Sequence, residues 1–188
     1  FDFGFPMGPF AMGDLAGLDV GWLVRKARAA TRPSNLRYSP IADRICEMGR
    51  YGQKTSAGWY NYEKGSRAPI PDPEIEKLIV DASEELGYVR RPIDEAEIIQ
   101  RCMYPLINEG AKILSEGIAQ RPGDIDTVWI YGYGFPRQRG GPMFYADTVG
   151  LKKVYDVMSA LYDQHGEWLK PAPLLAELAA AGKGFGDL

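Results

Sequence analysis

A passage that occurs twice constrains this chain more than any other feature. FGFPMGPFAMGDLAGLDV, residues 3 to 20, corresponds to YGFPRQRGGPMFYADTVGLKKV, which begins at residue 133. The second passage carries a three-residue insertion, yet the spacing of Gly, Pro and Asp is kept on both sides of it. The aligned residues are Gly4-Phe5-Pro6 with Gly134-Phe135-Pro136, Gly8-Pro9 with Gly141-Pro142, Asp14 with Asp147, and Gly17-Leu18 with Gly150-Leu151. Self-similarity over such a distance indicates two copies of one structural unit.

The two copies differ in what precedes the repeated passage. The second copy begins with a long stretch at 93 to 118 whose apolar residues recur at helical spacing, followed by an Asp-Ile-Asp turn. The first copy has no such stretch, so we expect its long helix and turn to lie upstream of Phe1. Phe1 is not an initiator methionine, and we expect the chain to begin inside a larger gene product.

Capping residues, glycines and prolines predict further helices. Ser39-Pro40 and Asp72-Pro73 resemble helix starts, because Ser and Asp accept backbone N–H groups and Pro suits the first helical position. The glycine- and proline-rich stretch at 51 to 71 shows no convincing strand alternation and predicts a loop. The fold class predicted is therefore all-α. The further predicted helices span 40 to 48, 73 to 86, a short turn after Pro122, 142 to 162 in two parts that meet near Gly150, and 171 to 181.

Composition excludes several classes of function. The 188 residues are 45% hydrophobic and 25% charged, which is typical of a globular protein with a core. A net charge of −3 provides no electrostatic footprint for nucleic acid, and no apolar run is long enough for a membrane helix. Cys46 and Cys102 lie among apolar helical positions, which predicts buried free thiols in a reducing compartment.

The combination of FGFPMGPFAMGDLAGLDV, GRYGQKTSAGWYNY and a degenerate second copy resembles the C-terminal region of 3-hydroxyacyl-CoA dehydrogenases. Two tandem copies are the arrangement of the multifunctional fatty-acid β-oxidation enzymes, which join an enoyl-CoA hydratase part to the dehydrogenase. The resemblance implies two tandem, pseudo-twofold-related helical units of the 6-phosphogluconate-dehydrogenase-C-terminal-like type. The first unit, 1–66, would be truncated at its N-terminus, 67–92 would be a linker and helix, and 93–188 the second unit.

The reaction that this resemblance implies is oxidation of an L-3-hydroxyacyl-CoA to a 3-ketoacyl-CoA, with NAD as hydride acceptor. That chemistry needs a base and a nucleotide-binding fold. The chain contains no G-x-G-x-x-G sequence, so no catalytic, NAD-binding or metal-binding residue is predicted and the fragment alone is expected to be inactive. The expected partners are the acyl-CoA substrate, the upstream dinucleotide-binding domain, other domains of the same polypeptide, and a second copy of the chain.

The resemblance places one part of the chain beside the substrate. Pro6 and Pro9 restrict the backbone, Gly8 lets the backbone approach a ligand, and Met7 and Phe10 suit an acyl chain. A helix start packed into the core explains the same residues equally well. The substrate-binding residues predicted are Phe5, Pro6, Met7, Gly8, Pro9 and Phe10.

Other polar residues carry weaker hypotheses. His165, the one histidine, precedes a glycine, where a helix-end or solvent-facing role outweighs a catalytic one. In the family an Asn that begins an Asn-Arg-x-x-x-Pro-x-x-Asn-Glu pattern contacts substrate. Here Gln100 replaces that Asn, while Asn108 and Glu109 are expected to tie the helix to its neighbours through hydrogen bonds.

Two loops contain basic residues. The stretch from Gly49 to Thr55 has the wrong glycine spacing for a phosphate loop and resembles the loop that closes the first copy; the role of Lys54 within it stays open. Arg137 and Arg139 replace Met7 in the second copy. They are expected to lie in a solvated loop, with contact to a CoA phosphate as the alternative.

Two other hypotheses stay open at this point. The chain could be a purely structural module that holds other domains together, or the helical half of another NAD-dependent hydroxyacid dehydrogenase. The expected location is cytoplasmic, because Gly186-Asp187-Leu188 is not the Ser-Lys-Leu peroxisomal signal; a peroxisome is the alternative in a eukaryote.

Overall fold

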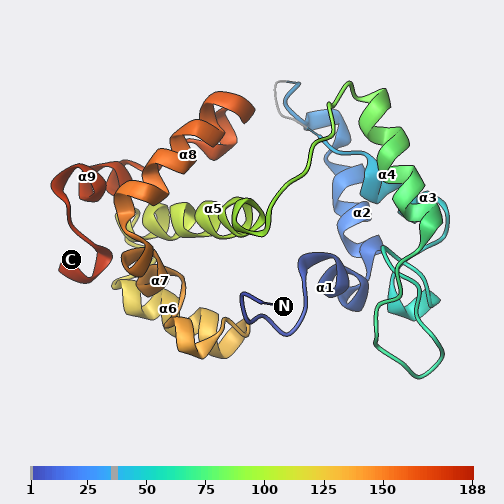
Figure 1. The fold of residues 1–188 in the computed structure, drawn as a ribbon, viewed down its shortest axis with the longest axis horizontal. Coiled ribbons are helices and arrows are strands. Elements are labelled where there is room, and N and C mark those ends of the chain that lie inside the picture. The colour runs from blue at the N-terminus through green and yellow to red at the C-terminus, as the bar shows by residue number, and fades with distance from the viewer. Residues whose placement is uncertain (1, 35–37) are drawn as a thin grey trace. The chain divides into compact units, whose positions relative to one another are not determined.

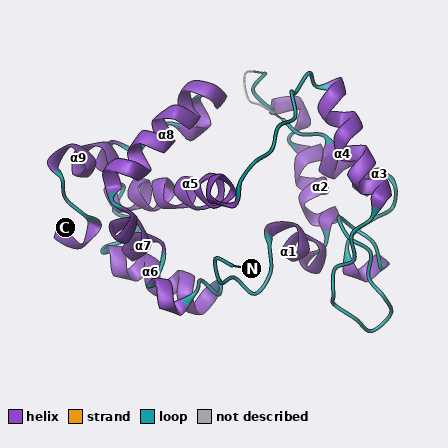
Figure 2. Ribbon diagram, in the orientation of Figure 1, coloured by secondary structure: helices purple, strands orange, loops and turns teal. Residues whose placement is uncertain are grey.

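The computed structural model describes residues 2–34 and 38–188. Within these residues the regular structure is helical, apart from three isolated antiparallel bridges in the loop at 51 to 71, which join Gly52 to Ala57, Ala57 to Asn61, and Asn61 to Ile70 (Figures 1 and 2). The prediction of an all-α chain is confirmed.

Most predicted helices begin and end close to the predicted residues, but after Pro122, where a short turn was expected, the structure has an 11-residue helix. Asp72 accepts a hydrogen bond from Glu74 N at 3.0 Å at the start of α4, as its capping role requires. The helix that was expected to begin after Ser39 begins one residue later, with Pro40 at its N-cap. The α-helices are α1 (Pro9–Ala16), α2 (Leu18–Ala27), α3 (Ile41–Glu47), α4 (Pro73–Glu85), α5 (Glu95–Ser115), α6 (Pro122–Gly132), α7 (Pro142–Val149), α8 (Leu151–His165) and α9 (Pro173–Ala181). Short 3-10 turns lie at η1 (Ala29–Thr31), η2 (Gln53–Thr55), η3 (Arg137–Arg139), η4 (Glu167–Leu169) and η5 (Phe185–Asp187).

The chain forms two compact units. The N-terminal unit is Met7–Pro92, and the C-terminal unit joins residues 2–6 to Ile93–Leu188. This division differs from the predicted segments 1–66, 67–92 and 93–188 in two ways. Helix α4 groups with the N-terminal unit, and residues 2–6 group with the second copy of the repeat rather than with the first.

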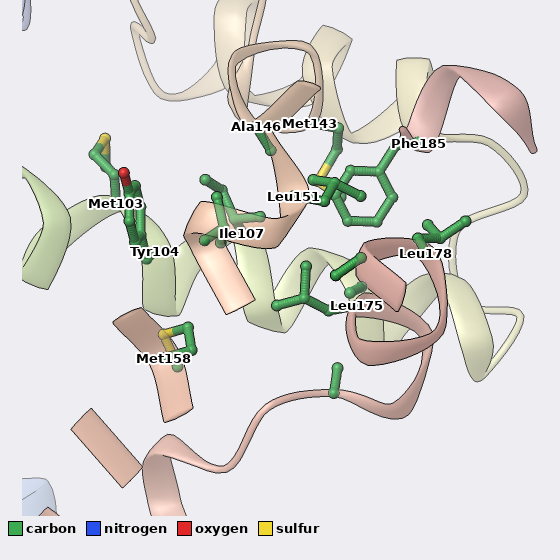
Figure 3. Packing of buried hydrophobic residues seen from close by; sticks show 14 of the residues in the cluster. Met103, Tyr104, Ile107, Met143, Ala146, Leu151, Met158, Leu175, Leu178 and Phe185 are labelled. Atoms are coloured by element: carbon green, nitrogen blue, oxygen red, sulfur yellow. The ribbon is translucent and has the colours of Figure 1, made fainter. Parts of the chain in front are cut away.

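The core of the C-terminal unit forms where α5, α7, α8 and α9 meet. Ile107, Met143 and Leu175 are each buried there, and Phe185 fills the same core from the last turn of the chain (Figure 3). Gly110 lets α7 approach α5, because a Cβ at that position would lie only 2.5 Å from Met143 Sδ. Gly110 is therefore a packing residue of α5. Cys102, which was predicted to be buried, is exposed on the same helix.

The N-terminal unit has a smaller core, to which α3 and α4 contribute Ile45, Cys46, Ile75 and Ala82. A polar network closes the loop that joins these helices. Arg50 donates to Gly58 O at 2.9 Å and forms an ion pair of 2.7 Å with Asp72, which also accepts from Asn61 at 2.8 Å. The bridged loop is therefore held by buried charge pairing rather than by a sheet.

Acid should weaken this network. Burial by itself raises the pKa of Asp72, but hydrogen bonds from Glu74 N, Arg50 and Asn61 lower that pKa overall, to below the ordinary value of 3.8. A carboxyl group whose folded pKa is lowered stabilises the fold above its unfolded pKa and loses that contribution as the pH falls through the folded value. We expect the stability of the N-terminal unit to fall below about pH 3.8. Urea unfolding at several pH values measures this: Asp72→Asn should flatten the dependence, whereas Asp163→Asn, an exposed control, should not.

The helix of the repeated passage has the same length and the same C-terminal end in both copies. Helices α1 and α7 each begin at a proline, each have eight residues, and each end at a glycine with positive φ, 98° at Gly17 and 93° at Gly150. Residues other than glycine rarely adopt this backbone conformation. It turns the chain so that the next helix, α2 or α8, begins at the following residue. The twofold relation between the copies stays a prediction.

Aspartates at equivalent positions of the two copies each bind a later segment of the same unit. Asp14, 1% exposed, accepts from Trp59 N at 2.9 Å, Tyr60 N at 3.1 Å and Tyr62 Oη at 2.9 Å. Asp147 accepts from Phe185 N at 2.7 Å and Gly186 N at 2.8 Å.

The glycine that precedes each pair of donors is required by this contact. A Cβ at Gly58 would overlap the Asp14 carboxylate, and a Cβ at Gly184 would lie 2.8 Å from Asp147 Oδ1. The sequence comparison aligned the two aspartates but missed this role. The signal that could have found it is a glycine followed by an aromatic residue near the end of each copy, at Gly58-Trp59 and Gly184-Phe185.

Candidate functional site

The predicted substrate-facing stretch, Phe5 to Phe10, contains the division between the two units, which falls after Pro6. Phe5 lies before that division, in the C-terminal unit, and is half-buried. Its ring stacks on Phe3 with centroids 5.7 Å apart, and meets Phe135 edge to face at 5.4 Å. Phe5 therefore belongs to an aromatic cluster of the C-terminal unit.

Pro6 also belongs to the C-terminal unit and is exposed, whereas Met7 to Phe10 lie in the N-terminal unit, at the start of α1. Gly8 is the N-cap residue, Pro9 takes the first helical position, and Met12 N donates to Gly8 O at 3.0 Å. Phe10 contacts Trp59, with ring centroids 4.4 Å apart, yet remains 49% exposed. Space around Gly8 is open, since a Cβ there would meet no atom within 4 Å. Open space around the backbone at Gly8 and an exposed apolar ring at Phe10 thus lie close together in this stretch.

The two arginines of the second copy have different surroundings. Arg137 is exposed, with its guanidinium 5.2 Å from the centre of the Tyr131 ring, which agrees with a solvated loop. Arg139 is half-buried and donates from Nε to Phe3 O at 2.6 Å, so the solvated-loop prediction is wrong for this residue. Sequence spacing could not reveal the contact, because its partners lie 136 positions apart.

His165 ends α8, as the glycine after it predicted. Its Nε2 atom lies 3.0 Å from Arg101 Nη1, and Arg101 Nε in turn donates to Glu97 Oε1 at 2.8 Å. The imidazole therefore takes part in a polar cluster between α5 and α8.

The residues of α5 that match the family's Asn-Arg-x-x-x-Pro-x-x-Asn-Glu pattern differ in what they contact. Asn108, 2% exposed, donates to Lys170 O at 2.9 Å and accepts from Ala172 N at 2.7 Å. The prediction that Asn108 ties the helix to a neighbour is confirmed. It is wrong for Glu109, which pairs with Lys112 on the same helix at 3.2 Å. Gln100 is half-buried.

The loop from Gly49 to Thr55 is built around α1 and α2. A Cβ at Gly52 would overlap the backbone of Asp14, so this glycine permits a close backbone contact. Lys54 Nζ forms an ion pair of 2.5 Å with Asp19, and that hydrogen bond is the main cause that lowers the pKa of Asp19. The loop closes the first copy, as its resemblance to the family implied.

Across 2–34 and 38–188, no three His, Cys, Asp or Glu side chains converge in a way that could hold a metal ion. In the same part of the chain, no helix has the length and apolar character needed to cross a membrane.

Comparison with known proteins identifies relatives of both copies. The family model described as "3-hydroxyacyl-CoA dehydrogenase, C-terminal domain" matches residues 1–62 and 98–185. The peroxisomal bifunctional enzyme of Cavia porcellus is 47% identical over 96% of this chain and 27% of its own length. The peroxisomal fatty acid beta-oxidation multifunctional protein of Oryza sativa is 33% identical over 94% of this chain and 25% of its own length. The chain thus spans about a quarter of these relatives.

Two solved structures are also similar to this chain. The crystal structure of the dehydrogenase part of multifunctional enzyme 1 from C. elegans is similar, with a TM-score of 0.71 and 29% identity, covering 94% of this chain and 39% of that one. The 3-hydroxybutyryl-CoA dehydrogenase of Escherichia coli has the same fold, with a TM-score of 0.68 at 19% identity over 96% of this chain and 52% of that one. Because the family model matches most of the length of this chain, the chain belongs to the 3-hydroxyacyl-CoA dehydrogenase C-terminal domain family.

Proposed function

We propose that this chain is the C-terminal helical part of a fatty-acid β-oxidation enzyme that oxidises L-3-hydroxyacyl-CoA to 3-ketoacyl-CoA with NAD. The observation that carries the proposal is the family match to residues 1–62 and 98–185, which includes both copies of the repeat. That match favours this function over the helical half of another hydroxyacid dehydrogenase. The names of the Cavia and Oryza relatives support a peroxisomal setting for the full-length enzyme.

NAD would be held outside this chain. A pyrophosphate is bound where a strand turns into a helix N-terminus in a βαβ unit. The described residues of this chain form helices and isolated bridges, so they do not fit that cofactor. The base and the NAD-binding domain would come from elsewhere in the longer polypeptide, and the chain alone would form no NADH.

The contribution of this chain to the substrate site would be the stretch from Phe5 to Phe10. Its support is the combination of the open backbone at Gly8 with the exposed ring of Phe10. An assembly function is a second candidate, favoured by Asn108 and Arg139, whose polar groups bind parts of the chain distant in sequence. The two functions are compatible, since one concerns the stretch at 5 to 10 and the other the C-terminal unit.

Replacing Met7 by Arg in the full-length enzyme tests the substrate role. A guanidinium in an apolar wall must lose water when the acyl chain binds, so dehydrogenase kcat/KM should fall at least about tenfold. Hydratase turnover, where the polypeptide carries that activity, should change little.

Met48→Arg is the matched control for this experiment. Met48 is also an accessible methionine of the N-terminal unit, but it lies at the end of α3, and its replacement should leave both activities unchanged. Equal loss of both activities in Met7→Arg, or of neither, would contradict the substrate role.

A further inference from the structure

Two Gly-Phe-Pro sequences, one from each copy of the repeat, meet within the C-terminal unit. Phe5 and Phe135 face each other edge to face. A Cβ at Gly4 would lie 3.0 Å from Pro136 Cγ, and a Cβ at Gly134 would lie 4.0 Å from Pro6 Cγ. The glycine of each sequence therefore packs against the proline of the other, a reciprocal contact of the kind that two copies of one surface make.

Arg139 breaks this reciprocity. It lies in the stretch where the second copy has four residues, 137 to 140, and the first copy has only Met7. From that insertion it donates to Phe3 O, and its guanidinium lies 4.2 Å from the centre of the Phe3 ring and 5.8 Å from that of Tyr145. The planar guanidinium thus combines a charge-assisted hydrogen bond with stacking on the same residue.

Residues 2–6 are held mainly by these contacts. Phe3 is buried between Arg139, Phe135 and Tyr145, whereas the neighbouring Asp2, Gly4 and Pro6 are exposed. Figure 1 shows this dark blue N-terminal segment beside the end of α6 in the C-terminal unit. Chain connectivity then places Met7 directly after the anchored segment.

We propose that Arg139 is a positioning residue: it holds residues 2–6 on the C-terminal unit and thereby sets where the substrate-facing stretch at 5 to 10 begins. This inference rests on the proposed function for its link to substrate, but the anchoring itself does not. The second copy, although degenerate, would act on catalysis through the insertion that distinguishes it from the first.

Limited proteolysis of the 188-residue chain tests the anchoring. Chymotrypsin can cleave between Phe3 and Gly4 only when the buried Phe3 leaves its place, so cleavage reports the population of the open segment. Arg139→Ala removes the charge-assisted bond and should speed this cleavage about tenfold relative to cleavage after Tyr88. Arg139→Lys should give an intermediate rate, because it keeps a donor but loses the planar stacking.

Arg137→Ala is the matched control, since Arg137 lies in the same turn but contacts Tyr131. In this variant the bond after Phe3 should be cleaved at the wild-type rate. Gly4→Ala approaches from the other side: a Cβ there would lie 2.8 Å from Gln138 Nε2 and should also release the segment. This variant decides the question if Arg139→Ala fails to fold. The anchoring would be overturned if folded Arg139→Ala were cleaved at the same rate as Arg137→Ala. If Arg139→Ala does not fold, the same comparison is made with Gly4→Ala.

Kinetics of the full-length enzyme test the positioning role. A displaced substrate stretch should raise KM for the acyl-CoA about tenfold with a smaller change in kcat, and Arg139→Lys should recover part of the loss. If Arg139→Ala speeds cleavage but leaves KM unchanged while Met7→Arg lowers turnover, the positioning role is overturned and the proposed function stands. If neither variant affects dehydrogenase turnover, the proposed function of the stretch is what fails.

Discussion

Replacing Asp14 by Ala should destabilise the N-terminal unit by on the order of 4 kcal/mol. The buried carboxylate accepts hydrogen bonds from Trp59 N, Tyr60 N and Tyr62 Oη. Alanine would leave three donors without this acceptor in a site too closed for easy hydration, and each buried orphan donor costs about 1–3 kcal/mol. Urea unfolding followed by peptide-resolved hydrogen exchange measures the loss separately in each unit.

Asp19→Ala is the control for this prediction. Asp19 lies five positions along from Asp14, but it forms an exposed pair with Lys54, and water screens such pairs, so its replacement should change stability far less than Asp14→Ala. The C-terminal unit should be unaffected by either change. A loss below about 1 kcal/mol in Asp14→Ala would show that the buried carboxylate does not hold the loop.

Amides of residues 10 to 24 should exchange at least about a hundredfold faster than those of α5, α7 and α8 in a dilute sample. The reason is that aligned apolar side chains are buried to different extents in the two units. Met143 is fully buried against α5 in the C-terminal unit, whereas Phe10, its equivalent in α1, is 49% exposed. Val20 and Leu23 on α2 are more than half exposed as well.

The scale of the effect follows from what α5 contributes. Seven of its large apolar side chains are buried or partly buried in the C-terminal unit: Ile99, Met103, Tyr104, Leu106, Ile107, Ile113 and Leu114. At about 1.5–3 kcal/mol each, such burial is worth on the order of 10–20 kcal/mol as an upper bound, against a net stability of about 5–15 kcal/mol for a domain. The N-terminal unit has no such helix among its described residues.

Self-association would cover the same apolar side chains, so exchange should be measured over a range of concentrations. Replacing Val20 and Leu23 by Lys should remove any dependence of protection on concentration. Strong, uniform protection of residues 10 to 24 in a strictly monomeric sample would contradict the prediction.

Much of the fold follows from local sequence. Asp72 before Pro73 defines the start of α4, and glycine at 17 and 150 ends a helix in each copy, because a cap or a positive φ depends on the few residues beside it. The repeat and its family resemblance depend on residue identity alone. Both were therefore accessible without coordinates.

The candidate site was accessible only in part. Its residues, 5 to 10, could be nominated from the family pattern, but the partners of Phe5 and Phe10 could not. Phe5 contacts Phe135, and Phe10 contacts Trp59, each across a long stretch of chain. The identity of an apolar residue does not reveal which residue it contacts, because the hydrophobic effect is non-directional.

The sequence by itself determined the helical class, the repeated unit and the family of this chain, since these depend on local propensity and residue identity. Only the tertiary structure decided that residues 2–6 pack with the second copy, that Arg139 anchors them, and that Asp14 closes the first unit. The physical reason is range. The bonds of Arg139 and Asp14 join residues 136 and at least 45 positions apart, and such contacts exist only once the chain has folded.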